Sequence, residues 1–423
     1  MLDNLGRGLR AEQDAELSGR DANPEPFAHA LLQDRPSLAR ALVGAVIDEP
    51  AGSLTRLLPV AVRELLLSDA DAGWEAIETL LDCDDLELTR LTAAGLHRFR
   101  GGRAVIDARE RAILERLLAY EDDVVRLQAL QVVRQISEYD RPMATELLLT
   151  VSFDQSPAVA EHVFYAFGEH GYLPYEDLGD TDRERILAEI ASLPTIDEYA
   201  VQAFLADLSA TYSDEVLQLL KHRSAAEVRP RISGYRALPD RWHKELRFRG
   251  SPRFGELLWD AITWVAENLD GTGGLEPGAV FAAVAVTYDD AVLVVLGRAL
   301  GAGTANYIRA VGEVLEYAHR TFVWDHSDFV TQALDAADEH RDQCSRAMRR
   351  GIYAAVRKDG FGGPIGAPAR HHLEQRDRSR AVAAALTEGS AGREFYEALA
   401  RSAESEILGE LGHDRLFLES RDW

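Results

Sequence analysis

One short pattern recurs along this sequence and constrains the fold more than any other feature. In EDDVVRLQALQVVRQI, residues 121–136, the spacing Asp-x-x-Val-Arg-x-x-Ala is filled by Asp122, Val125, Arg126 and Ala129. Apolar residues at this spacing share one face of an α-helix, and an Asp before the first turn can cap its free N–H groups. The pattern predicts an amphipathic helix whose apolar face needs a neighbour.

Related segments lie at regular intervals on both sides of this one. Copies of the pattern, with further amphipathic stretches between them, follow one another at roughly 30 to 50 residues, which is typical of an α-solenoid. We therefore expect an all-α fold, more than 60% helical, built as a right-handed superhelix of antiparallel helix pairs. The copies are residues 34–47, 84–96 and 154–168, and the stretches between them are 57–67, 110–120 and 142–151.

The pattern resembles the HEAT family of helical repeats. The resemblance is carried by the four residues of the first pattern and by a partial copy from Asp85 to Ala93, in which Arg90 and Ala93 match Arg126 and Ala129. It covers about the first half of the chain. It implies a stacked superhelix with an extended binding surface, and it implies no catalytic activity.

The Val-rich run at 278–300 fits either a strand or two helices, and its helical surroundings favour helices broken at 288–290. Glycine and proline together predict breaks at 271–278 and at 360–368. We expect three regions, which are N-terminal HEAT-like repeats at 1–222, a basic, loop-rich connection at 223–253 and C-terminal repeats at 254–423.

Three segments of the later part, at 322–330, 376–386 and 392–407, resemble the C-terminal helical-repeat regions of large bacterial signalling and defence NTPases. The sequence has no Gly-x-x-x-x-Gly-Lys-Ser/Thr phosphate loop, so NTPase activity does not carry over. The resemblance implies the sensor or scaffold portion of such a system.

Composition limits the class of protein. A formal net charge of −25 disfavours non-specific attraction to nucleic-acid phosphates over most of the surface. Two cysteines, Cys83 and Cys344, are too few for a disulfide framework. The sequence shows no signal-peptide pattern and no apolar run long enough to span a membrane, so we expect a soluble, cytoplasmic protein without membrane contact.

Two basic segments interrupt this acidic background. Residues 221–253 hold ten Lys or Arg against three acidic residues, and 341–380 hold ten against four. Either segment could dock on the protein's own carboxylates or on a second copy, or bind an acidic protein, a phosphate or a nucleic acid. In the first segment the candidate binding residues are Arg241, Trp242, Arg247 and Arg249, since Trp242 could stack on a base, with Asp240 nearby as an acid.

In the second segment a Gly-rich loop at 360–368 precedes a run of basic side chains. Backbone N–H groups of such a loop can approach an anion, although a plain interhelix loop explains the glycines equally well. We expect a partly exposed basic patch whose arginines contact either the protein's own carboxylates or a partner. The candidate residues are Arg370, His371, His372, Arg376, Arg378 and Arg380.

No nucleophile elbow, His-Glu-x-x-His pair or dinucleotide-binding glycine motif occurs, so we assign no catalytic residue, cofactor or metal ligand. The sequence favours a non-catalytic scaffold or sensor module that binds a protein partner, as part of a bacterial signalling or defence system. The alternative is a nucleic-acid-binding or base-processing HEAT-like protein that uses the two basic segments. Self-association through the two basic segments is a third possibility.

Overall fold

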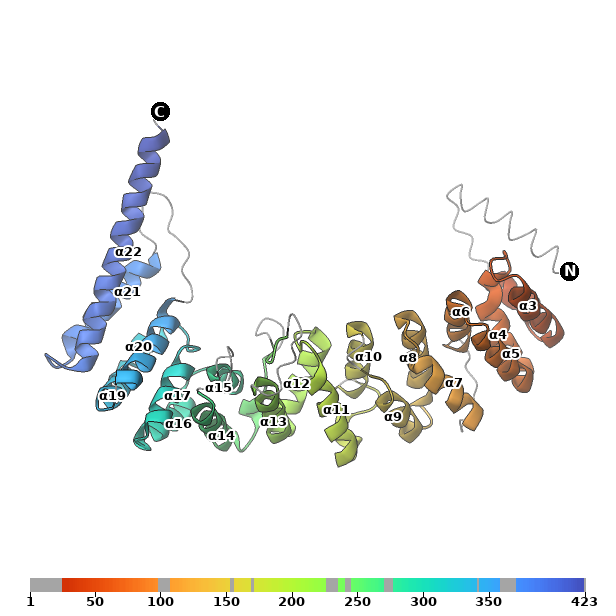
Figure 1. Cartoon of the computed structure of the whole chain (residues 1–423), viewed down its shortest axis with the longest axis horizontal. Helices are drawn as coiled ribbons and strands as arrows, with labels where there is room; N and C mark the ends of the chain where they lie inside the picture. Colours follow the sequence, from red (N-terminus) through yellow and green to blue (C-terminus); the bar gives the residue numbers. More distant parts are fainter. Residues whose placement is uncertain are drawn as a thin grey trace. The chain divides into compact units, whose positions relative to one another are not determined.

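The computed structural model describes residues 25–97, 107–152, 156–168, 171–225, 235–239, 245–269, 277–340, 342–357 and 370–421. Over these residues the chain is all-helical, with 77% helix and no strand (Figure 1). The predicted all-α class is confirmed. The chain divides into two compact units, Met1–Leu193 and Pro194–Trp423, and this division lies before the connection expected at 223–253.

The first unit is built of two rows of helices. Helices α4, α6, α8 and α10 pack one against the next, and α3, α5 and α7 form a second row that contacts the first. The bounds are α2 (Glu25–Leu32), α3 (Pro36–Asp48), η1 (Thr55–Leu57), α4 (Leu58–Ser68), α5 (Ala70–Asp82), α6 (Leu86–His97), α7 (Ala108–Leu118), α8 (Asp123–Ile136), α9 (Arg141–Leu149), α10 (Pro157–Phe167), η2 (Tyr175–Asp177) and α11 (Asp180–Ser192).

Every helix expected in this unit from the repeated pattern is present. In one row, a polar side chain caps the N-terminus of each of three successive helices. The Asp85 carboxylate accepts from the Leu88 N–H at 3.0 Å before α6, and the Asp122 carboxylate accepts from the Val125 N–H at 3.2 Å before α8. Ser156 caps α10 in the same way. These caps satisfy N–H groups that the first turn leaves without a partner, so each helix begins at the same point of the pattern.

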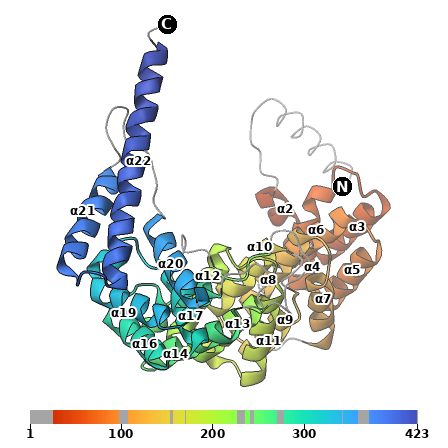
Figure 2. The same ribbon diagram turned by 60° about the vertical axis from the view of Figure 1, so that its left-hand side comes forward.

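In the second unit, too, alternate helices are in contact with one another. Helices α13, α15, α17 and α20 pack in succession, α14, α16, α19 and α22 do the same, and α21 lies along α22 (Figure 2). The bounds are α12 (Tyr199–Thr211), α13 (Ser213–Ser224), η4 (Phe248–Gly250), α14 (Phe254–Glu267), α15 (Gly278–Ala285), α16 (Asp290–Gly301), α17 (Ala305–Leu315), α18 (Phe322–Asp325), α19 (Ser327–Asp338), α20 (Asp342–Arg357), α21 (Arg370–Ala385) and α22 (Ala391–Arg421).

The Val-rich run at 278–300 forms α15 and α16, which confirms the helical interpretation. Asp289 lies in the break between the two helices, and its carboxylate caps the start of α16 by accepting from the Val292 N–H. Among the described helices, none combines the length and the apolar character that crossing a membrane requires.

Helices α17 and α20 cross at two glycines. A Cβ atom built on Gly351 would lie 1.9 Å from the backbone oxygen of Gly312, and one built on Gly312 would lie 2.9 Å from the backbone of Ala347. Both contacts are with backbone atoms, which cannot rotate away as a side chain can. The crossing therefore requires glycine at both positions.

Candidate partner-binding surfaces

Ion pairs join neighbouring helices of a row in the first unit. The Arg90 guanidinium on α6 binds Asp122 through two bonds, from Nε to Oδ1 at 3.1 Å and from Nη2 to Oδ2 at 2.6 Å. Asp122 is also the cap of α8, so one carboxylate fixes the start of its helix and attaches that helix to α6. The hydrogen bonds from Arg90 hold the pKa of the Asp122 carboxyl below its usual range.

The arginine of the central pattern is structural. Arg126 is 2% exposed, and its Nη2 donates to Asp123 Oδ1 at 2.6 Å. Asp123 Oδ2 accepts from the Ser156 hydroxyl at 2.6 Å, and Ser156 begins α10. The Ser156 hydroxyl and the Arg126 guanidinium together lower the pKa of the Asp123 carboxyl. Residues 121–136 thus connect three helices of the fold.

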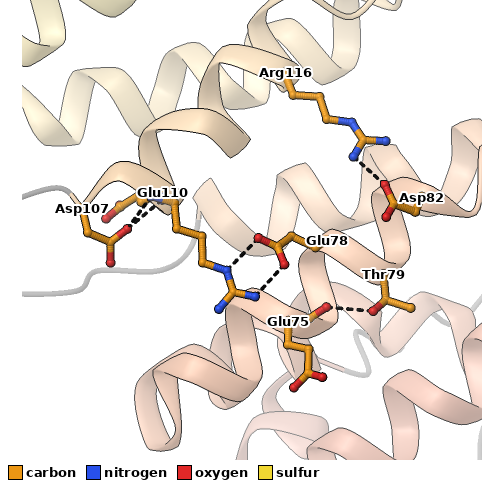
Figure 3. A network of polar contacts seen from close by, with 8 residues as sticks. Glu75, Glu78, Thr79, Asp82, Asp107, Glu110 and Arg116 are labelled. Carbon is orange, nitrogen blue, oxygen red and sulfur yellow. Dashed lines mark hydrogen bonds and ion pairs between the residues drawn. The ribbon is translucent and has the colours of Figure 1, made fainter.

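The second row of this unit is linked in the same way. Arg109 on α7 binds Glu78 on α5 through two bonds of 2.7 and 2.6 Å, and Arg116 Nη1 donates to Asp82 Oδ1 at 2.7 Å (Figure 3). Asp107 caps α7 by accepting from two backbone N–H groups. Exposed pairs of this kind contribute little stability individually, but their geometry fixes the register of one helix on the next.

In the second unit the first basic segment meets the protein's own carboxylates. Five of its described cations pair with acidic residues 39 or 40 positions away, whereas the buried Arg223 donates to the backbone oxygens of Arg236 and Ala237. Two of the predicted binding residues, Arg247 and Arg249, belong to this set, whereas Arg241 and Trp242 lie outside the described residues. The pairs are Lys221–Asp260, Arg236–Asp197, Arg247–Asp207, Arg249–Asp289 and Arg253–Asp214.

The predicted arginines of the second basic segment lie on α21 and are paired as well. Arg370 is 92% exposed, so solvent reaches this end of α21 freely. The patch is partly exposed as expected, but each positive charge has a negative neighbour. The pairs are Arg370–Glu374, Arg376–Asp377, Arg378–Asp325 and Arg380–Glu404.

The two predicted histidines belong to the contact between α21 and α22. The ring centroids of His371 and His372 are 3.9 Å apart, and His372 Nε2 lies 3.5 Å from Glu410 on α22. Within the described part of the chain, no group of three or more His, Cys, Asp or Glu side chains is placed to hold a metal ion. The Gly-rich loop at 360–368 lies outside the described residues.

An aromatic surface on α14, α16 and α17 was not predicted from the sequence. The Trp259 ring stacks with Tyr307 at 5.4 Å between centroids and 22° between planes. The Arg298 guanidinium carbon lies 3.8 Å from the centroid of the Trp259 ring. Val294, one helical turn before Arg298, is 72% exposed, more than any other large hydrophobic residue described. We call Trp259, Val294, Arg298 and Tyr307 the Trp259 surface.

Arg298 differs from the cations of the two basic segments. It is exposed, and no carboxylate in the described part of the chain pairs with it. A guanidinium stacked on an indole keeps its in-plane N–H donors available to a carboxylate. The sequence contains one indication of this contact, because Trp259 and Arg298 are 39 positions apart, the same separation as the Lys221–Asp260 ion pair of this unit.

No family model matches this chain, and no curated protein matches it.

Proposed function

We propose that the chain is a HEAT-like α-solenoid of stacked antiparallel helix pairs that acts as a non-catalytic scaffold or sensor module for a protein partner. The contact of alternate helices within each unit supports the solenoid, since each pair then buries its apolar face against the next. The one-repeat spacing of the ion pairs supports it independently. The resemblance of the later segments suggests a bacterial signalling or defence system.

The Trp259 surface is the observation that best supports the proposed binding of a protein partner. Tryptophan, tyrosine and arginine are the residues that most often dominate the energy of protein interfaces, and here all three are in contact at one place. Exposed Val294 adds apolar area beside the cation. A partner segment with a carboxylate next to an apolar side chain matches this combination.

The ion pairs of the two basic segments with the protein's own carboxylates also favour the Trp259 surface as the binding surface. A nucleic-acid phosphate or an acidic partner at Arg378 or Arg249 would meet the carboxylate of Asp325 or Asp289, and the like charges repel each other. Binding at Arg298 displaces no carboxylate of the described chain. We therefore favour a protein partner over nucleic acid.

Site-specific photo-crosslinking tests this assignment. A photoreactive amino acid at Val294 should trap one defined protein in cells of the source, and the same amino acid at Leu408 should not. Leu408 is a suitable control because it is an aliphatic residue of the same unit with nearly the same exposure, 70% against 72%. Arg298→Glu should abolish the crosslink at position 294. Equal crosslinking at both positions, or a crosslink unaffected by Arg298→Glu, would contradict the proposal.

A further inference from the structure

A groove of about 300 Å³ lies in the first unit between α9 and residues 173–182. One wall is the face of α9 that carries Arg141, Thr145 and Leu149, and the other wall includes Leu173 and Asp182. Its volume is at the lower end of the range for small-molecule sites, roughly 300 to 1,000 Å³. The groove therefore suits one long side chain better than a large ligand.

The wall at 173–182 is held by contacts of the protein itself. Gly171 lies so close to the end of α10 that a Cβ there would be 2.1 Å from the Ala166 oxygen, and the same oxygen accepts from the Leu173 N–H at 3.0 Å. Further along, Arg183 Nη1 donates to Leu178 O at 3.0 Å. A side chain can therefore enter the groove without a costly rearrangement of this wall.

The groove combines buried leucines with a carboxylate. Leu149, Leu173 and Leu178 line it and are buried, so they form its apolar floor. Asp182 also lines it and is half-buried, and no cation of the described residues pairs with Asp182. An apolar floor beside a carboxylate matches a guest that carries a positive charge at the end of an apolar stem.

Asp177 supplies a second carboxylate at the exposed edge of the groove. Its Oδ2 lies 3.5 Å from Arg141 Nη1, which is longer than the roughly 2.7 to 2.9 Å of a charge-assisted hydrogen bond, and both side chains are exposed. This pair is therefore weak, and a guest cation can bind Asp177 without breaking a hydrogen bond. Glu146, in contrast, already accepts from Arg111 Nη1 at 2.9 Å.

We propose that this groove binds one arginine side chain from a basic segment of a protein partner. The aliphatic part of the arginine packs on the three leucines, and its guanidinium binds Asp182 and Asp177 through separate N–H donors. The net charge of −25 attracts a basic segment toward the chain. The groove is in the first unit, and the proposal does not depend on the Trp259 surface.

Methyl NMR of the full chain tests the groove with a single-arginine peptide, acetylated and amidated Ala-Ala-Arg-Ala-Ala. The methyl resonances of Leu149 and Leu178, assigned by their loss in Leu149→Met and Leu178→Met, should move on titration with this peptide. The same peptide with citrulline, a neutral isostere, in place of arginine should leave them unmoved. Equal shifts with both peptides, or no shift with the arginine peptide, would overturn the proposal.

Matched variants separate binding in the groove from general attraction to an acidic protein. Asp182→Asn should weaken binding of the arginine peptide about fivefold, whereas Glu184→Gln should leave it unchanged, because Glu184 is an exposed acid of the same helix outside the groove. Arg141→Gln should strengthen binding about twofold by freeing Asp177, and Arg185→Gln, at an exposed position of α11, should not. Equal affinities within either pair of variants would show that the groove is not the binding site.

Discussion

Replacing Gly351 with alanine tests the close crossing of α17 and α20. The added Cβ would lie 1.9 Å from Gly312 O, whereas ordinary contacts begin at 3.4 Å, so the two helices must move apart by about 1.5 Å. Overpacking of this kind costs about 1 to 3 kcal/mol, and we expect the upper end because the atoms of Gly312 that the added Cβ meets belong to the backbone. Alanine recovers up to about 1 kcal/mol through its higher helix propensity. The net loss in the free energy of unfolding is therefore about 2 kcal/mol.

Gly297→Ala is the matched control. Gly297 lies inside α16 of the same unit, and a Cβ there meets nothing within 4 Å. This variant gains the helix propensity without the clash, so it should be more stable than the wild type by up to about 1 kcal/mol. Urea unfolding followed by circular dichroism should thus separate the two variants by about 3 kcal/mol. Equal stability of Gly351→Ala and Gly297→Ala would refute the close crossing.

Three further predictions concern charges and buried hydroxyls. The folded-state pKa of Asp122 lies below its unfolded value, so the Asp122 carboxylate stabilises the fold above about pH 4, and this contribution is lost as the pH falls further. Asp122→Asn should therefore reduce the change in the urea midpoint between about pH 5 and pH 3. Tyr172→Phe should raise the free energy of unfolding, measured in urea, by about 1 kcal/mol, because it removes a buried hydroxyl with no partner in the described chain. Replacing Arg370, Arg376 and Arg378 together with alanine should leave the melting temperature nearly unchanged, because these side chains form surface ion pairs on α21; a large drop would show that the pairs hold α21 in place.

The local structure was largely predictable because each helix carries its own signals. The apolar spacing of Val125, Ala129 and Val133 predicts a buried face, and all three residues are fully buried. Asp122 marks the start of α8 in the sequence and caps it in the structure. Even the Val-rich run at 278–300 was correctly assigned, because the break at Asp289 separates two helical patterns.

The contacts between helices distant in the sequence were not predictable in the same way. The partner of Arg90 is 32 residues away, and only the stacking of α6 on α8 brings the two together. The sequence left open whether the basic segment at 221–253 pairs with the protein's own carboxylates, because the partners of its paired cations lie 39 or 40 positions away. The Trp259 surface was missed for the same reason, since its residues come from three helices.

The affinity of the partner trapped at Val294 tests the proposed function most directly. Isothermal titration should show at least tenfold weaker binding to Arg298→Gln than to the wild type, since this change removes the charge and the N–H donors above Trp259. Arg253→Gln, an exposed arginine of the same unit that already pairs with Asp214 and Glu256, should change the affinity less than twofold. Equal affinities of wild type and Arg298→Gln would contradict partner binding at the Trp259 surface.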